Sequence, residues 1–398
     1  MTHALSDITV IDVSRILAGP YCTMMLGDFG AEIIKIEQPG RGDDTRHWGP
    51  PFTETGQSAY FLCANRNKRS LALNLKHPRG QEILRELVRQ GDVLIENFKA
   101  GTMERLGLGY ESLREINPGL IYCAITGYGQ NGPYRDRPGY DTAIQAQGGV
   151  MSITGPVDGE PYKVGVAIVD VTTGMNAAIA ILAALHHRER TGQGQFIDVA
   201  LFDSHLGWLI NVASSYLVSG EPPRRYGNAH ATIVPYQTFA TADGYLMLAV
   251  GNDGQFAAFC RVIQRPELAQ DPRFATNPAR VQNREALIPL LARIFHQRTT
   301  AEWLEALVAA KVPCSPVNDI PAALADPQAQ ARNMVQEVVD SQGSRVPQVG
   351  PVAKMSETPP SIRTAPPYLG EHTAQILRER LGFDDDLIAQ LRAEGVIG

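Results

Sequence analysis

The sequence predicts an α/β protein in which a mostly parallel β-sheet forms a large domain and a smaller α+β domain follows it. Over roughly the first half of the chain, short β-branched segments alternate with helical segments. Such alternation is typical of parallel strands joined by helices that cover both faces of the sheet. After the proline-containing segment 221–225, the pattern changes to a hairpin and several helices. The chain has 398 residues, which is the length of about two to three domains.

The elements of the large domain are expected to follow one another in βαβ order. We expect strands at Ile8–Asp12, Ala31–Glu37, Ser70–Asn74, Val93–Glu96 and Leu120–Thr126. We expect helices at Tyr21–Asp28, Gly80–Gln90 and Asp141–Ala146. The apolar segment Val164–Val169 is expected to be a buried strand that leads into a buried helix, and 196–218 continues with a strand and an apolar helix.

The small domain is expected at residues 225–325. Tyr236–Val250 is typical of a hairpin, because Asp243-Gly244 suits its turn. Helical patterns follow at 254–264, 283–297 and 300–310. Residues 346–370 contain six prolines, which indicates an extended connector. Amphipathic helices are expected at 372–381 and 384–394, and we assign 340–398 to a segment that returns to the large domain, whose first part is 1–215.

Composition narrows the class of protein. The chain is 44% hydrophobic and 20% charged, which is typical of a soluble globular protein. Its net charge of −6 disfavours a nucleic-acid-binding protein but does not exclude anionic small molecules. The five cysteines lie at least 41 residues apart, so no zinc-binding spacing exists, and we expect reduced thiols. Because the first residues resemble no targeting segment, and the apolar stretch Val164–Leu185 is interrupted by polar residues, we expect a cytoplasmic protein that inserts into no membrane.

Polar and glycine-rich segments border the predicted strands. They span 14–20, 42–49, 65–69, 96–101 and 127–133, and we expect them to meet at one edge of the sheet, where ligands bind in parallel sheets. The basic residues within Arg66–Arg69, together with Lys99 and Arg105, would complement phosphates. For each segment taken alone, the alternative is a solvated turn. A Walker-type phosphate-binding loop is absent, and the first turn carries Leu17-Ala-Gly-Pro20 in place of GxGxxG.

Asp170 is an ionisable residue within an apolar setting. One interpretation is an N-cap, since aspartate at the start of a helix accepts from free backbone N–H groups. The other interpretation is a partly desolvated nucleophile that forms a covalent acyl intermediate. The two roles are compatible, because a helix N-terminus also stabilises negative charge that develops beside the nucleophile.

Several segments together resemble the class III CoA-transferases, a family that includes formyl-CoA transferase, carnitine CoA-transferase and α-methylacyl-CoA racemase. The segments are LAGPY, GAEIIKIEQPGRGDDTR, NRNKRSLALN, ENFKAG, GLGY, ITGYGQNGP, GYD, GVAIVDVTTGM, NAHATIVPYQTFATADGY and GEHTAQIL. They cover nearly the whole chain. The resemblance is greatest to the succinate–hydroxymethylglutarate (glutarate) CoA-transferase branch, through GDDTRHWGPPF, ANRNKRS, ITGYGQNGP and HATIVPYQTF.

The resemblance implies a Rossmann-like large domain, a small α+β domain and an interlocked homodimer. It implies that Asp170 is the catalytic nucleophile, and that CoA moves from a short dicarboxylyl-CoA such as succinyl-CoA to a dicarboxylic acid. The intermediates would be an aspartyl anhydride and an aspartyl-CoA thioester. The partners would be acyl-CoA and a carboxylic acid, with no metal, nucleic acid or membrane. The alternatives are an acyl-CoA racemase or epimerase of the same fold and a catalytically silent CoA-binding protein. Tyr140 stands where the racemase has a histidine base, which disfavours racemisation.

The resemblance also implies contacts with coenzyme A. The matching positions are Leu17, Ala18, Leu73, Asn74, Leu75, Lys76, Asn97, Phe98, Lys99, Arg105, Arg137 and Tyr140. Gln38 and Leu17 replace an arginine and a glutamine of formyl-CoA transferase, and Gly251–Gln255 replaces its glycine flap, which argues against oxalate as acceptor.

The acid substrate is expected to meet a second set of residues, namely Arg15, Arg46, His47, Asp141, Gly251 and Gln255. One of Arg15, Arg46 and His47 is expected to pair with the distal carboxylate of a dicarboxylic acid. The alternative is a surface arginine that holds its own loop through Asp43 or Asp44.

Overall fold

The computed structural model describes residues 3–398 and divides them into two compact units. The first unit contains the chain up to Val150, Val164–Glu221 and Pro327–Gly398. The second unit contains Met151–Lys163 and Pro222–Asp326. Residues 151–163 lie within the range expected for the large domain, yet they group with the second unit.

A parallel sheet forms the centre of the first unit, as the alternating pattern predicts. Its strand order is β3-β2-β1-β4-β5-β6. The strands are β1 (Thr9–Asp12), β2 (Glu32–Glu37), β3 (Lys68–Ala72), β4 (Val93–Glu96), β5 (Ile121–Thr126) and β6 (Gln195–Ala200). Ile11 of β1 pairs with Ile34 on one side and Leu94 on the other. The strand order reverses between β1 and β4, and a ligand crevice is expected at the carboxyl ends of strands beside such a reversal.

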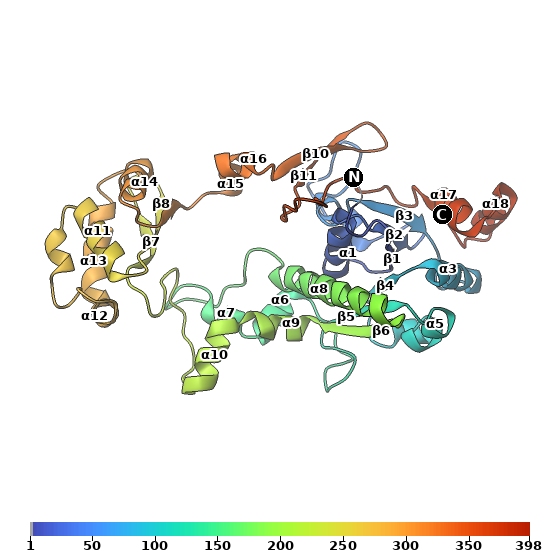
Figure 1. The fold of residues 1–398 in the computed structure, drawn as a ribbon, viewed down its shortest axis with the longest axis horizontal. Coiled ribbons are helices and arrows are strands. Elements are labelled where there is room, and N and C mark those ends of the chain that lie inside the picture. Colours follow the sequence, from blue (N-terminus) through green and yellow to red (C-terminus); the bar gives the residue numbers. More distant parts are fainter. Residues whose placement is uncertain (1–2) are drawn as a thin grey trace. The chain divides into compact units, whose positions relative to one another are not determined.

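One face of the sheet is covered by α1 (Ala18–Asp28), α6 (Asp141–Gln147), α8 (Ile168–Thr191) and α9 (Leu201–Trp208), as Figure 1 shows. Helix α8 packs closely on α1, because Gly174 leaves no side chain between them. A Cβ at Gly174 would lie 2.6 Å from the carbonyl oxygen of Ala18. The strand expected at Val164–Val169 is wrong, since this segment is irregular up to the start of α8.

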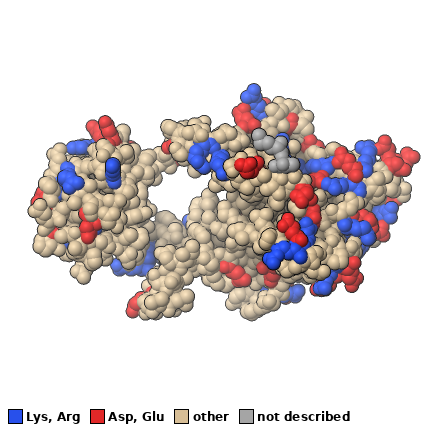
Figure 2. All heavy atoms as spheres, viewed as in Figure 1, with Lys and Arg blue, Asp and Glu red and all other residues tan. Residues whose placement is uncertain are grey.

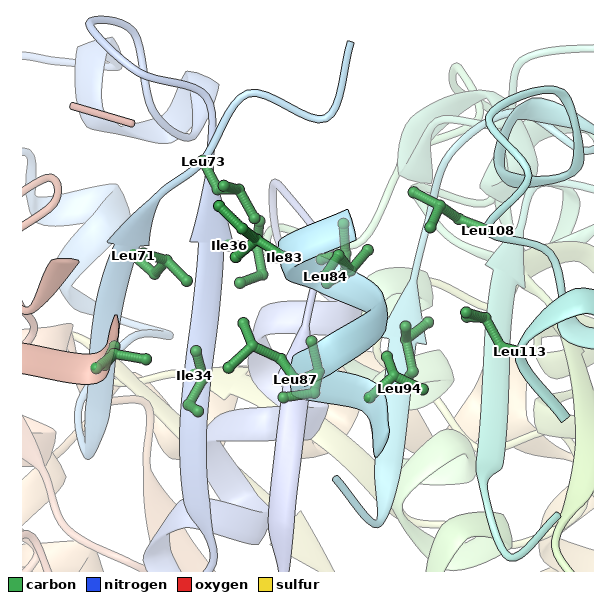
Figure 3. Packing of buried hydrophobic residues seen from close by; sticks show 14 of the residues in the cluster. Ile34, Ile36, Leu71, Leu73, Ile83, Leu84, Leu87, Leu94, Leu108 and Leu113 are labelled. Carbon is green, nitrogen blue, oxygen red and sulfur yellow. The ribbon is translucent and has the colours of Figure 1, made fainter. Parts of the chain in front are cut away.

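The opposite face is covered by α3 (Pro78–Gln90), α5 (Tyr110–Ile116), α17 (Thr373–Leu381) and α18 (Asp385–Ala393). Figure 3 shows leucines of α3, among them Leu84 and Leu87, over strand residues such as Ile34 and Leu94. The chain end reaches the same unit, since Ile397 forms a bridge with Leu73. Burial of these side chains on both faces fixes where each strand ends, and therefore where the following loops lie.

Short elements complete the first unit. They are η1 (Asp44–His47), α2 (Ala59–Leu62), α4 (Thr102–Arg105), α10 (Ile210–Ser219), α16 (Pro327–Ala331), β10 (Val335–Val339) and β11 (Arg345–Val349). Helix α7 (Val150–Ile153) spans the boundary between the units. Strands β10 and β11 form an antiparallel hairpin, so the expectation of an extended connector from residue 346 is wrong for its first residues. Pro347 lies in this hairpin, which leaves one edge open, as proline in a strand requires.

The second unit packs helices on an antiparallel sheet. The sheet contains β7 (Tyr236–Ala240), β8 (Tyr245–Ala249) and β9 (Cys314–Pro316). The helices are α11 (Asp253–Val262), η2 (Pro266–Ala269), α12 (Asn277–Gln282), α13 (Arg284–Phe295), α14 (Thr300–Ala309) and α15 (Ile320–Ala325). The expected hairpin turn at Asp243-Gly244 is confirmed, and a capping box between Thr299 and Glu302 begins α14.

The surface of the first unit mixes both signs of charge, and basic and acidic side chains lie next to one another on the face seen in Figure 2. Helix α8 is long and apolar enough to cross a membrane by length and composition, a test that core helices of soluble proteins also pass. It contacts α1 and the sheet, and 44% of its apolar window is buried.

Candidate active site

Two adjoining cavities lie where the strands of the parallel sheet end. The first, about 300 Å³ in volume, is bordered by the ends of β1, β2 and β3 and by α4, and we call it the apolar cavity. The second, about 640 Å³, lies at the ends of β1, β4 and β5 and contains Asp170, and we call it the Asp170 cavity. The structure therefore brings the segments after β1, β2, β4 and β5 together at one edge, as expected from parallel strands.

Asp170 lies in the first turn of α8 rather than at its N-cap, which is Ala167. The capping role belongs to Asp141, whose Oδ1 accepts from the backbone N–H groups of Val169 (2.8 Å) and Asp170 (3.4 Å). Gln145 holds the Asp141 carboxylate in place by donating to its Oδ2 at 2.7 Å. Because Asp141 binds the N–H groups at the start of α8, the Asp170 carboxyl is not needed as a helix cap. It accepts no hydrogen bond from any residue in 3–398, so its oxygens are available as nucleophiles.

The protonation of Asp170 is shifted by its surroundings. Burial, and next the negative charge of Asp141, raise the pKa of Asp170 to about 7. A carboxylate that has lost hydration and faces a like charge is more basic, and hence a stronger nucleophile, than an exposed one. Its burial and raised pKa favour the interpretation of Asp170 as a nucleophile over its interpretation as an N-cap residue.

Two aromatic residues beside the cavity were missed by sequence reasoning. Trp48 lines the Asp170 cavity and contacts Tyr60 edge-on, with ring centroids 5.0 Å apart. Burial, and next the charge of Asp170, raise the pKa of Tyr60 to about 12. Trp48 belongs to the polar segment 42–49, in which the charged residues carry the stronger signal for a ligand site, and Tyr60 lies in none of the predicted segments.

The positions expected to contact CoA are distributed over both cavities. Leu17, Ala18, Asn97, Phe98, Lys99, Arg137 and Tyr140 line the Asp170 cavity, and Asp141 lines it as well. Leu73, Asn74, Leu75 and Lys76 line the apolar cavity, where Gln38 is also found. Arg105 lines neither, but it donates to the hydroxyl of Thr102 (2.9 Å), a residue of the apolar cavity.

The three residues expected to pair with a distal carboxylate of the acid substrate lie in different surroundings. Arg15 lines both cavities, and it also pairs with Asp44 at 3.1 Å, which is the contact of the alternative interpretation. Arg46 instead forms a two-pronged pair with Glu37 (2.8 and 2.7 Å) and stacks on a buried aromatic ring. His47 meets the carbonyl of Arg41 at 2.9 Å. Arg46 and His47 therefore organise their own loop.

The basic residues Arg66–Arg69 do not face the cavities. Their segment leads into β3 and includes its first two residues, Lys68 and Arg69, so it lies at the opposite edge of the sheet from the carboxyl ends of the strands. Arg66 pairs with Asp28 (2.7 Å), Lys68 with Asp12 (3.1 Å), and Arg69 with two glutamates. The expectation that these cations complement phosphates is wrong, because their charges are already neutralised inside the fold.

A buried ionic cluster supports the loop that enters both cavities. Lys35 donates to Asp43 at 3.0 Å, and both side chains are fully buried. Asp43 also accepts from the backbone N–H of Ile16 (3.2 Å), a residue held at a φ of 70°. Lys35 and neighbouring donors hold the pKa of Asp43 low, at about 2, against the opposing effect of burial, which is the largest single influence. The cluster therefore fixes the backbone that presents Leu17 to the Asp170 cavity.

Gly251 and Gln255 belong to the second unit, where the backbone N–H of Gly251 donates to Gln255 Oε1 at 2.8 Å. Their assignment to the acid substrate stays a prediction. Residues 3–398 contain no group of three His, Cys, Asp or Glu side chains placed to hold a metal ion.

Comparison with known proteins identifies the family. The family model described as CoA-transferase family III matches residues 5–373. The chain belongs to this family. Succinyl-CoA:glutarate CoA-transferase of Mus musculus is 45% identical to this CoA-transferase over 393 residues, which cover 99% of this chain and 90% of that protein.

Two further proteins are similar over most of the CoA-transferase. Succinate–glutarate CoA-transferase of Agrobacterium fabrum is 47% identical over 380 residues, covering 94% of this chain and 95% of that protein. The crystal structure of a CAIB/BAIF family protein from Brucella suis superposes with a TM-score of 0.87 at 47% identity, covering 96% of this chain and 100% of that one. The expected family, enzyme class and α/β fold are confirmed.

Proposed function

We propose that this CoA-transferase moves CoA from succinyl-CoA, or another short dicarboxylyl-CoA, to a dicarboxylic acid. The observation that carries the proposal is Asp170, a desolvated carboxyl that lines a cavity adjoining a second, largely apolar one. The names of the mouse and Agrobacterium relatives support succinate and glutarate as the acids.

In the first half-reaction, an Asp170 carboxylate oxygen attacks the thioester carbonyl of the donor, and the carbon–sulfur bond breaks to release CoA thiolate. The product is an anhydride between Asp170 and the donor acid. The thiolate then attacks the Asp170 carbonyl, and the donor acid departs with one oxygen that belonged to Asp170. An aspartyl-CoA thioester remains, which preserves the energy of the original thioester.

The second half-reaction runs in the opposite sense with the acceptor. The acceptor carboxylate attacks the aspartyl thioester and displaces CoA thiolate, which forms a second anhydride. The thiolate attacks the acceptor carbonyl, and Asp170 is released with one oxygen that came from the acceptor. The N-terminus of α8, held by Asp141, stabilises negative charge that develops at the Asp170 carbonyl.

Arg15 is the residue we propose for the distal carboxylate of the acid, since it lines the Asp170 cavity and its side chain is 47% exposed beside Asp44, whereas Arg46 and His47 line neither cavity. Removing its guanidinium would raise the KM for a dicarboxylic acceptor by about tenfold and leave a monocarboxylic acceptor little changed. Equal effects on both acceptors would contradict the assignment.

A homodimer is part of the proposal. Large apolar side chains are exposed on α8, α9 and α10 of the first unit, namely Ile179, Leu206, Ile210, Leu217 and Val218. Exposed apolar side chains on neighbouring helices favour association with another copy. Light scattering after size-exclusion chromatography should give twice the chain mass of 43.3 kDa; a monomer at assay concentration would contradict the proposal.

The test of the function combines a substrate panel with trapping. Succinyl-CoA is offered with glutarate, malate, mesaconate and monocarboxylic acids, and hydroxylamine is added during turnover to capture the activated aspartyl carbonyl. We expect CoA transfer to a dicarboxylic acid and hydroxamate at Asp170. Asp170→Ala should abolish transfer while it leaves CoA affinity nearly unchanged. Transfer by this variant would contradict the mechanism, and exchange of the α-proton without transfer would instead identify an epimerase.

A further inference from the structure

The two cavities share a boundary that we call the neck, formed by Arg15, Arg41, Asp44 and Phe98, each of which lines both cavities. Asp44 lies between the two arginines. Its Oδ2 accepts from Arg15 Nη1 at 3.1 Å, and its Oδ1 accepts from Arg41 Nη2 at 2.7 Å. One carboxylate thus holds two guanidinium groups, so the neck carries an excess of positive charge.

The other buried charges of the apolar cavity balance one another. Lys35 is neutralised by Asp43, and Glu37 by Arg46, which lies outside the cavity. Lys76 adds a further cation to the lining. The positive charge that remains for a ligand of the apolar cavity is therefore one excess charge at the neck and the charge of Lys76, while the rest of the cavity offers apolar surface.

The two arginines of the neck differ in how firmly they are held and in how much of each side chain is exposed. The backbone of Arg15 is held, because its N–H donates to Asn97 (2.8 Å) and its carbonyl accepts from the same side chain; the Arg15 side chain is 47% exposed, and its guanidinium lies 5.4 Å from the Phe98 ring centre. The Arg41 side chain is 66% exposed. It stands between Gly40 and Gly42, both at positive φ, so its loop turns sharply and presents the side chain outward.

We propose that Arg41 binds the 3′-phosphate of coenzyme A. The proposal rests on the proposed function, in which a CoA thioester reaches Asp170. If the adenine occupies the apolar cavity and the pantetheine arm extends to Asp170, the ribose with its 3′-phosphate lies at the neck. This phosphate monoester carries nearly two negative charges at neutral pH and suits a guanidinium that already has one carboxylate partner. Nothing in the first-turn motif or the strand-end segments singled out this residue.

The experiment compares CoA with 3′-dephospho-CoA, which lacks only the phosphate in question. Dissociation constants for both ligands are measured by isothermal titration calorimetry with the wild-type protein and with Arg41→Ala. We expect Arg41→Ala to weaken CoA binding by about tenfold at low salt and to leave 3′-dephospho-CoA binding unchanged. The preference of the wild-type protein for CoA should shrink at high salt, since an exposed charge pair is screened.

Arg89→Ala is the matched control. Arg89 is also an exposed arginine that pairs with a carboxylate three residues away, Glu86, but it lines neither cavity. It should bind both ligands as the wild-type protein does. Equal weakening of both ligands by Arg41→Ala, or no weakening of either, would overturn the proposal. Wild-type protein that binds no CoA would instead overturn the proposed function.

Discussion

Replacing Asp141 by asparagine should move the pH dependence of CoA transfer to lower pH. The substitution removes the negative charge that faces Asp170 and keeps an oxygen that can accept from the Val169 N–H. The reactive form of Asp170 is its carboxylate, so the rate rises with pH through the pKa of Asp170. A lower pKa therefore shifts the rising limb of kcat/KM toward acid.

The size of the shift follows from the two causes of the raised pKa. The pKa of Asp170 lies at about 7 against an ordinary value of 3.8, and burial contributes more than Asp141 does. Asp141 accounts for less than half of the rise, so its neutralisation lowers the pKa of Asp170 by roughly one unit, or about 1.4 kcal/mol. The midpoint of the limb should move from about 7 in the wild-type protein to about 6 in Asp141→Asn.

The assay is kcat/KM for succinyl-CoA, with the acceptor saturating, between about pH 5 and pH 9. Asp136→Asn serves as the control, because Asp136 lines the same cavity but is 73% exposed and faces Lys99 at 4.0 Å. Its charge is screened by water, so its removal should leave the midpoint in place. An unchanged or higher midpoint in Asp141→Asn would refute the electrostatic coupling of the two carboxyls.

Three further substitutions test the surroundings of the site and the second unit. Burial raises the pKa of Glu96 from 4.5 to about 8, so the free energy of unfolding of the wild-type protein falls as pH rises between these two values. Glu96→Gln lacks this loss. It should therefore be more stable than the wild-type protein near pH 9, by up to about 4 kcal/mol in urea unfolding, and no more stable near pH 4. Gly174→Ala forces a Cβ against the Ala18 carbonyl and should cost about 1–3 kcal/mol and raise the KM for acyl-CoA. Arg280→Ala leaves buried carbonyls of the second unit without a donor and should cost about 2–4 kcal/mol in the same unfolding assay.

The sheet and the position of its ligand edge were predictable from sequence. Strands β1 to β5 differ from the expected segments by at most two residues at either end, because β-branched runs bounded by glycine and polar residues carry a strong local signal. Once the strands are parallel, the loops that follow them meet at one edge without further information. Asp170 was found for the same local reason, as a lone carboxyl in an apolar run.

The predictions that were wrong depended on contacts between residues distant in sequence. Val164–Val169 has the composition of a strand, yet Asp141, which precedes Asp170 by 29 residues, caps the helix at Ile168 and ends the irregular segment there. Arg66 and Lys68 look like free cations in the sequence, but the fold brings Asp28 and Asp12 to them. Such partners become visible only when the strands and helices are assembled.

The transfer of oxygen to Asp170 tests the covalent mechanism most directly. Trypsin should release the peptide between Lys163 and Arg188, in which Asp170 is the only carboxyl side chain. After turnover of succinyl-CoA with a dicarboxylic acceptor whose carboxylates carry ¹⁸O, mass spectrometry of this peptide should find heavy oxygen on Asp170, and the released succinate should carry it as well. Heavy oxygen in the succinate with none on Asp170 would show that the acids exchange without an aspartyl intermediate, and would contradict the account.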